Sequence, residues 1–159
     1  MKIYVKQKVI SWSNSFTVKD EYGDDRWYAK SEIFSLGLKL HVIDADGVER
    51  ALIRRKLWTP FFPRCTIDIN NDQYLLYKHP ALFKQDFRLE GTDWRLWGDY
   101  TAHEYQLFSG GDAVMRMSKK WFSWGDSYEL DIADPGDELL SLCIALSVDM
   151  INDSSRNNN

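Results

Sequence analysis

The chain has 159 residues, of which 44% are hydrophobic and 14% are aromatic, and its formal net charge is −4. A chain of this length supports one domain with a substantial core, and its aromatic content excludes a disordered chain and favours β structure. The negative charge argues against general nucleic-acid binding, which needs a clustered basic surface. We therefore expect one folded domain with no nucleic-acid partner.

The cysteines and the N-terminus bear on the cellular compartment. Cys65 and Cys143 are too few for a disulfide framework, and Cys143 lies in an apolar segment where a thiol acts as a small hydrophobe. Residues 1–8 alternate between polar and apolar side chains and lack the apolar core of a signal peptide. We expect a soluble, cytoplasmic protein that is not transmembrane.

Most of the chain before residue 133 consists of short segments in which apolar and polar residues alternate, a pattern typical of β-strands. Turn residues separate the segments; Asp46-Gly47 is a strong hairpin signal, and Pro60 and Pro63 interrupt the strand ladder because proline has no N–H to donate. We predict about twelve strands, at residues 2–10, 16–20, 26–31, 38–44, 48–57, 65–69, 73–78, 82–89, 94–99, 103–108, 113–119 and 127–132.

Residues 138–151 form an apolar segment near the C-terminus. Ten of these fourteen residues are apolar and they occupy nearly the whole circumference of a helix, so the helix must be buried on nearly all sides. Its length of about 21 Å is too short to cross a membrane. Asp134 is placed to cap the helix and Pro135 to occupy its first position. We predict a central helix at about residues 135–151 and a disordered polar tail at residues 153–159.

The combination of many strands with one buried helix decides the fold class. A β-sandwich fills the space between its sheets with side chains, whereas a closed barrel of about twelve strands has a lumen wide enough for a helix. We therefore predict a mainly β protein: a closed antiparallel barrel around a buried, apolar C-terminal helix, forming a single domain over residues 1–152.

Two stretches of the chain are similar and indicate an internal repeat. The turn glycines Gly47 and Gly111 are 64 residues apart, and so are the basic pairs at residues 55–56 and 119–120. Aromatic residues follow each basic pair, at positions 58, 61 and 62 in one copy and 121, 122 and 124 in the other. A duplicated half-barrel explains this spacing, and chance likeness between two hairpins is the alternative.

This order of features resembles the LURP-one-related family, which belongs to the tubby C-terminal-like group together with the phospholipid scramblases. The likeness extends from about Ile3 to Ile151 and is most specific at residues 118–121, 128–131 and 134–140. It implies a twelve-stranded barrel around a C-terminal helix, in agreement with the pattern above. Tubby domains bind phosphoinositides and scramblases are tied to phospholipid movement and calcium, but their binding residues have no match here residue by residue.

The best candidate site is formed by the two segments that combine basic and aromatic residues, 54–62 and 119–124. Cations beside Trp and Phe are what an anionic lipid interface attracts. The alternative is that the aromatic residues turn inward and the basic residues form a solvated face. Alternation places Ala51, Ile53 and Arg55 on one face of their strand. The candidate lipid-binding residues are Arg54, Lys56, Trp58, Lys119, Lys120 and Trp121.

Motifs for catalysis or metal binding are weak. His41, His79 and His103 are dispersed without a partner at ligand spacing, and the segment Asp44-Ala45-Asp46 lacks the later glycine and glutamate of a calcium loop. We expect no cofactor, no metal site and no enzymatic activity. The predicted function is a binding or scaffold module whose partner is either anionic membrane lipid, bound peripherally, or another protein; an enzyme acting on a small molecule is the remaining alternative.

Overall fold

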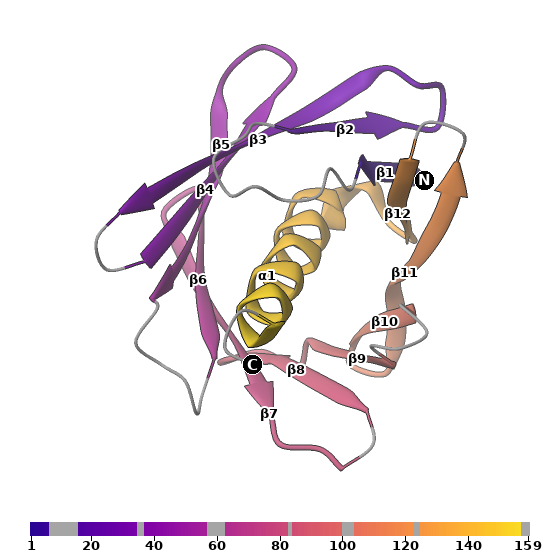
Figure 1. Cartoon of the computed structure of the whole chain (residues 1–159). Helices are drawn as coiled ribbons and strands as arrows, with labels where there is room; N and C mark the ends of the chain where they lie inside the picture. Colours follow the sequence, from indigo (N-terminus) through magenta and orange to yellow (C-terminus); the bar gives the residue numbers. More distant parts are fainter. Residues whose placement is uncertain are drawn as a thin grey trace.

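A closed β-barrel with a helix through its lumen makes up the protein (Figure 1). The structure, a computed structural model, describes residues 1–6, 16–34, 37–56, 63–82, 84–99, 104–122 and 125–156. Within these residues twelve strands follow one another around the barrel, each antiparallel to its neighbours, and β1 closes the ring against β12. The predicted fold class is confirmed.

The strands and helices follow the predicted order closely. Their bounds are β1 Lys2–Lys6, β2 Phe16–Asp20, β3 Asp25–Phe34, β4 Gly37–Asp44, β5 Glu49–Lys56, β6 Arg64–Ile69, β7 Asp72–His79, β8 Gln85–Leu89, β9 Arg95–Asp99, β10 Glu104–Ser109, β11 Asp112–Phe122, β12 Gly125–Ile132, the 3-10 turn η1 Pro135–Asp137 and the helix α1 Glu138–Arg156.

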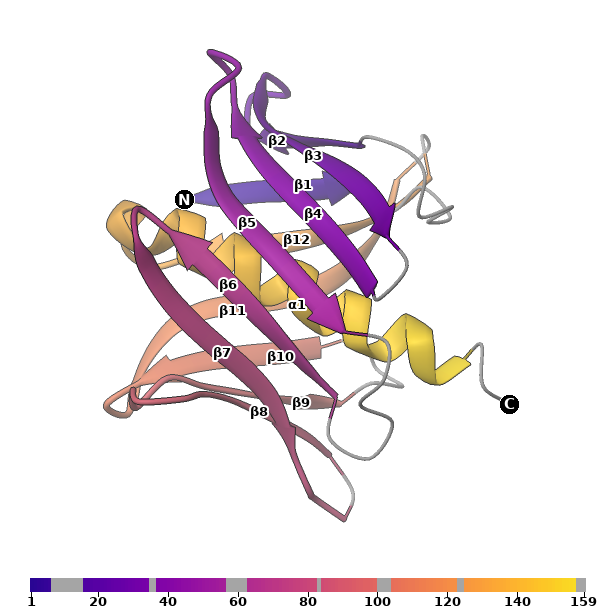
Figure 2. The same ribbon diagram turned by 90° about the vertical axis from the view of Figure 1, so that its left-hand side faces the viewer.

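Alternating side chains along each strand build the core. In β5, Ala51, Ile53 and Arg55 are buried while the residues between them are more exposed, so every second side chain points into the barrel. Residues 141–148 of α1 are all buried, as expected for a helix without a polar face. Figure 2 shows α1 running along the inside of the barrel. The helix thus supplies the apolar filling that the inward rows of the strands require.

The start of the helix is fixed by a cap and an ion pair. The Asp134 carboxylate accepts a hydrogen bond from the Gly136 amide at 2.8 Å, which confirms the predicted cap, although the first turn is 3-10 and not α. The buried carboxylate of Glu138 accepts hydrogen bonds from the Arg26 guanidinium, at 2.5 and 2.7 Å, and from Trp27 Nε1 at 2.8 Å. These bonds attach the beginning of α1 to strand β3.

The helix ends later than its apolar pattern predicts. It continues to Arg156, whereas the prediction ended it at Ile151 and placed a polar tail from residue 153. Asn152 is buried and its amide bonds both Gln85, at 3.1 Å, and the Tyr105 hydroxyl, at 3.4 Å. The barrel wall supplies partners for this polar residue, and each residue added to an existing helix gains a backbone hydrogen bond at little cost in free energy. The helix therefore continues beyond its last apolar residue.

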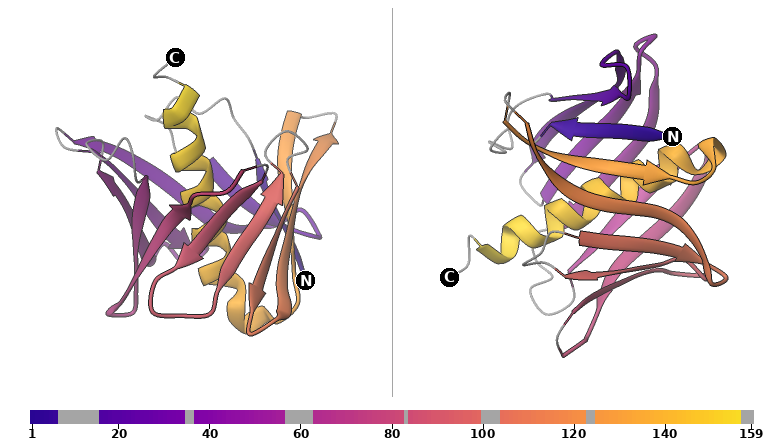
Figure 3. Two further views of the ribbon diagram at one scale, coloured as in Figure 1. Left: turned by 90° about the horizontal axis from the view of Figure 1, so that it is seen from below. Right: turned by 90° about the vertical axis from the view of Figure 1, so that its right-hand side faces the viewer.

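The two ends of the barrel are distinguished by where the helix begins and ends. At one end, which we call the entry end, α1 begins and tight turns such as residues 45–48 join the strands. At the other, the exit end, α1 emerges with the C-terminus (Figure 3). Because the strands alternate in direction, all odd-numbered strands finish at the exit end, among them β5 at Lys56, β7 at His79 and β11 at Phe122.

Candidate functional site

The two basic and aromatic segments reach the same end of the barrel. Strands β5 and β11 both finish at the exit end, and they lie six positions apart in the ring in either direction, on opposite sides of the lumen. Residues 57–62, which include Trp58, and residues 123–124 lie outside the described part of the chain. The shared end is therefore established by the strands, and the exposure of the aromatic residues stays a prediction.

Strand β5 presents its three basic residues in different surroundings. Arg54 lies on the outer side, where its Nη2 donates to Asp68 Oδ2 at 2.6 Å and its side chain is 42% exposed. Lys56 is exposed at the exit end. Arg55 points inward and is only 7% exposed, as alternation predicts. Of the two outward cations, Lys56 is thus the one placed at the rim.

For the second segment the structure describes the backbone alone. Lys119, Lys120 and Trp121 belong to β11 and pair with Tyr128, Ser127 and Asp126 of β12, respectively. Their side chains are outside the described part of the molecule, so their role in binding remains a prediction from the sequence.

Arg55 is an unusual feature of the barrel interior. Its Nε is buried and has no hydrogen-bond partner among the residues that the structure describes. Burial lowers its pKa, because the low-polarity interior disfavours the charge. On the neighbouring strand Cys65 donates to the carbonyl of Ser147 at 3.8 Å, and burial raises the pKa of this thiol to about 12.

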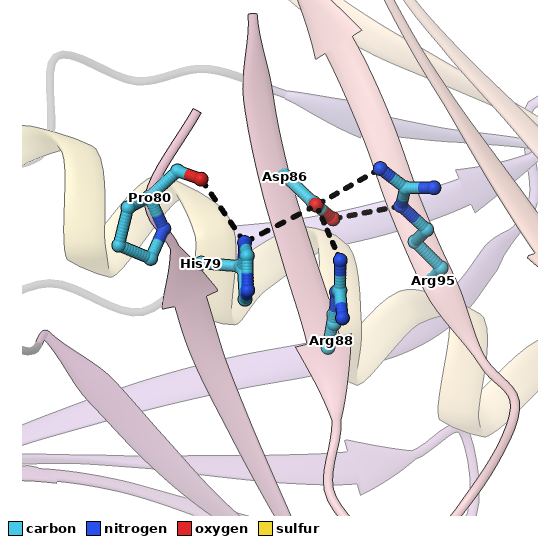
Figure 4. A network of polar contacts seen from close by, with 5 residues as sticks. All are labelled: His79, Pro80, Asp86, Arg88 and Arg95. Atoms are coloured by element: carbon cyan, nitrogen blue, oxygen red, sulfur yellow. Dashed lines mark hydrogen bonds and ion pairs between the residues drawn. The ribbon is translucent and has the colours of Figure 1, made fainter. Parts of the chain in front are cut away.

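A compact charged cluster lies on the outer face of β7, β8 and β9 (Figure 4). Its centre is Asp86, whose side chain is 2% exposed. Arg95 binds this carboxylate with two hydrogen bonds, Nε to Oδ1 and Nη2 to Oδ2, each of 2.9 Å, and Arg88 Nη2 donates to Oδ2 at 3.1 Å. Two arginines are thus held in place by one buried carboxylate.

The electrostatics of this cluster favour an ionised Asp86. Burial by itself raises the pKa of the carboxyl group, but the hydrogen bonds and positive charges of Arg95 and Arg88 outweigh burial, so the pKa lies below its ordinary value. The Arg95 guanidinium also lies over the ring of Trp97, 4.6 Å from the ring centroid, which further restricts its position. Charge and geometry therefore fix both guanidinium groups.

His79 completes the cluster and has a defined tautomer. Its Nδ1 lies 3.0 Å from the carbonyl oxygen of Pro80 and 3.7 Å from Asp86 Oδ2. Because both neighbours are acceptors, Nδ1 carries a hydrogen and donates to Pro80. The ring thereby joins the end of β7 to the connection between β7 and β8.

That connection presents an exposed apolar side chain at the exit end. His79 and Asp86 form the last pair of the β7–β8 ladder, and Leu82, between them in sequence, is 93% exposed. Lys84 in the same connection is also exposed. An apolar tip beside cations is suited to a surface that is both apolar and anionic.

Two of the remaining candidates from the sequence, Asp44 and His41, have partners within the barrel wall and its turns. The Asp44 carboxylate accepts from the amides of Asp46 and Val48, at 3.0 and 2.9 Å, which makes this segment a turn and leaves little capacity for calcium. His41 lies between Glu49, at 2.8 Å, and Glu32, at 3.3 Å, partners that its sequence neighbours do not reveal. His103 is outside the described residues.

A metal-binding cluster and a membrane-spanning helix are both absent from the described residues. There, no group of three or more His, Cys, Asp or Glu side chains is arranged to hold a metal ion. Over the same residues, no helix has the length and apolar character needed to cross a membrane.

Comparison with known proteins places the chain in a family. Residues 1–149 match the profile of the LURP-one-related family. The chain belongs to the LURP-one-related family. It is 34% identical over 152 residues to the Bacillus subtilis (strain 168) protein described as uncharacterized protein YxjI, covering 95% of this chain and 93% of that one.

A solved structure supports the fold. The X-ray structure of an Arabidopsis thaliana protein superposes with a TM-score of 0.60 at 17% sequence identity, covering 91% of this chain and 88% of the plant protein. This identity is low, so the comparison bears on the fold and not on a ligand. The resemblance to the LURP-one-related family inferred from the sequence is confirmed by the match of residues 1–149 to the family profile.

Proposed function

We propose that this protein is a non-enzymatic binding module that attaches peripherally to anionic phospholipid through the exit end of its barrel. The observation that carries the proposal is that β5 and β11, the strands that lead into the two basic and aromatic segments, both finish at that end, on opposite sides of the lumen. Two separated contact regions at one end allow the barrel to rest on a flat surface.

The filled lumen supports a surface site over an internal one. Residues 141–148 of α1 are buried against the inward rows of the strands, so the interior holds a helix where other barrels hold a ligand. A partner is then expected at the rims or on the outer face. Exposed Lys56, Leu82 and Lys84 supply cationic and apolar contacts at the exit end.

Electrostatic attraction at this end provides a useful but modest affinity. Each basic residue near an anionic membrane surface contributes about 1 kcal/mol, and the contribution weakens with salt. Several such residues give reversible attachment even though the whole chain has a net charge of −4. Anionic lipids enrich the cytoplasmic leaflet, so the proposal places the protein in the cytoplasm, peripheral to the membrane.

Co-sedimentation with vesicles tests the proposal. The test variant carries Lys56→Glu and Lys120→Glu, on β5 and β11 at the exit end. Its matched control carries Arg50→Glu and Arg116→Glu, which make the same charge change on the same strands closer to the entry end. We expect the wild type and the control to bind vesicles containing phosphatidylserine, with binding that falls as salt rises, and the test variant to lose most of this binding.

The opposite results would reject the proposal. Indifference of the wild type to anionic lipid, or equal losses in the test and control variants, would show that the exit end is not the membrane-binding surface. A protein partner captured through Leu82, without any lipid binding, would favour the alternative of a protein-interaction module.

A further inference from the structure

The cluster around Asp86 has an excess of positive charge directed outward. Arg88 and Arg95 share one carboxylate, and the Nη1 atom of neither guanidinium takes part in the bonds to it. Arg88 Nε is also buried without a hydrogen-bond partner. The two side chains are 40% and 45% exposed. Donors that are fixed in position and still open to solvent are the basis of an oxyanion site.

A third arginine lies in the same row across the barrel wall. Arg64 pairs with Tyr77, Tyr77 with Arg88, and Arg88 with Arg95, so these side chains come from adjacent strands at one level. Arg64 is exposed. Neighbouring strands are about 4.8 Å apart, which places Arg64 about 10 Å from Arg88. The row is a strip of three cations on the outside of an acidic protein.

Other carboxylates on the adjoining strands are displaced from this strip. Asp99 on β9 pairs with Glu104 on β10. Asp86 pairs with Trp97, which precedes Asp99 by two residues, so the Asp99–Glu104 pair lies closer to the exit end than Asp86 does. Glu104 lies 3.6 Å from Arg116. The carboxylate that contacts Arg88 and Arg95 is therefore Asp86, which is buried beneath them.

We propose that Arg88 and Arg95 form a binding site for the phosphate monoester of a lipid headgroup. A monoester exposes three terminal oxygens and up to two negative charges, which match two guanidinium groups better than the two oxygens and single charge of a diester. Leu82 lies in the connection from β7 to β8, six residues before Arg88, so the same hairpin carries an arginine of the site and an exposed apolar side chain. This inference rests on the proposed function and specifies its ligand chemistry.

Asp86 acts in this site as a positioning residue. It does not contact the ligand; it holds Arg95 through both oxygens and Arg88 through one. Arg88 is therefore the guanidinium that is removed with less disturbance, because Asp86 keeps its two bonds to Arg95 when Arg88 is replaced. Arg50 on β5 supplies the matched control. It donates to the carboxylate of Asp44 on β4 at 2.6 Å, and this arginine–carboxylate pair lies away from the proposed site.

The experiment compares the wild type with Arg88→Gln, Arg88→Lys and Arg50→Gln on three probes: vesicles containing phosphatidic acid, vesicles containing phosphatidylglycerol at matched zeta potential, and inorganic phosphate. We expect the wild type to bind phosphatidic acid vesicles about tenfold more tightly than phosphatidylglycerol vesicles. A factor of about ten in affinity is what one hydrogen bond to a charged group contributes. Arg88→Gln should abolish the preference, Arg88→Lys should retain part of it, and Arg50→Gln should leave it unchanged. Thermal unfolding of each variant confirms that it is folded.

The outcomes separate this inference from the proposed function. If vesicles bind but Arg88→Gln keeps the full preference, or the wild type has none, the inference is overturned while the membrane proposal stands. If no anionic vesicle binds, the membrane proposal fails. The measurements with inorganic phosphate then test the site by themselves. A rise in melting temperature that phosphate causes and that Arg88→Gln removes would identify a soluble phosphate as the ligand. Absence of that rise as well would reject the site altogether.

Discussion

Replacing Arg55 with methionine is expected to stabilise the protein. Arg55 is 7% exposed as a residue, and its Nε is buried without a hydrogen-bond partner, so folding removes the hydration of this nitrogen without a compensating partner. Methionine is also unbranched, and it keeps an apolar stem at this inward position of β5. The substitution removes the cost of burying the charge and keeps most of the packing.

The magnitude follows from the cost of a buried charge. An ion buried in a protein interior carries an effective penalty of several kcal/mol, and apolar replacements of buried ionic groups stabilise proteins by about 1–4 kcal/mol. We expect Arg55→Met to raise the free energy of unfolding by about 1–3 kcal/mol, allowing for partial relaxation around the arginine. For a chain of this length that corresponds to a rise in melting temperature of about 3–10 °C.

Urea denaturation and calorimetry measure this change, and the adjacent residue supplies the control. Arg54 is on the outer side of the same strand, is 42% exposed and donates to Asp68. Arg54→Met removes the same guanidinium from a partly exposed ion pair, and we expect it to lower stability by at most about 1 kcal/mol. A loss of more than 1 kcal/mol in Arg55→Met would show that the buried guanidinium is stabilised in the native state and would refute the reasoning.

Two further predictions concern the buried carboxylates of Glu138 and Asp86. Arg26→Ala should destabilise the protein by about 1–3 kcal/mol, because Glu138, at 4% exposure, loses the partner that binds both of its oxygens; urea denaturation unaffected by the change would contradict this. Asp86 has a lowered native pKa, so its stabilising contribution is present at neutral pH and is lost as the pH falls through that pKa. The stability gap between the wild type and Asp86→Asn should therefore narrow below about pH 4, and a gap that stays constant in acid unfolding would argue against ionic stabilisation.

The fold could be predicted because its signals are local. Alternation marks each strand, the Asp46-Gly47 turn and the later Gly111 turn mark hairpins, and an apolar segment without a polar face requires a sheath. The end of α1 was missed because Asn152 finds its partners on β8 and β10, far away in sequence. The two hairpins do lie six strands apart, and the predicted duplication itself remains a prediction.

The Asp86 cluster could be recognised only in part from the sequence. Asp86 and Arg88 are two residues apart around the apolar Phe87, so alternation places both on the same outer face. Arg95 and His79 come from other strands, and their approach depends on strand register, which composition and spacing do not determine. The pairing of Arg54 with Asp68 escaped prediction for the same reason.

The most direct test of the account asks which end of the barrel faces the membrane. An environment-sensitive fluorophore is attached at Leu82→Cys near the exit end or at Val48→Cys in a turn at the entry end, since the native Cys65 and Cys143 are buried. We predict that vesicles containing phosphatidylserine raise and blue-shift the emission at position 82 and leave position 48 unchanged. A response at position 48, or none at position 82 while the protein co-sediments with the vesicles, would contradict attachment through the exit end.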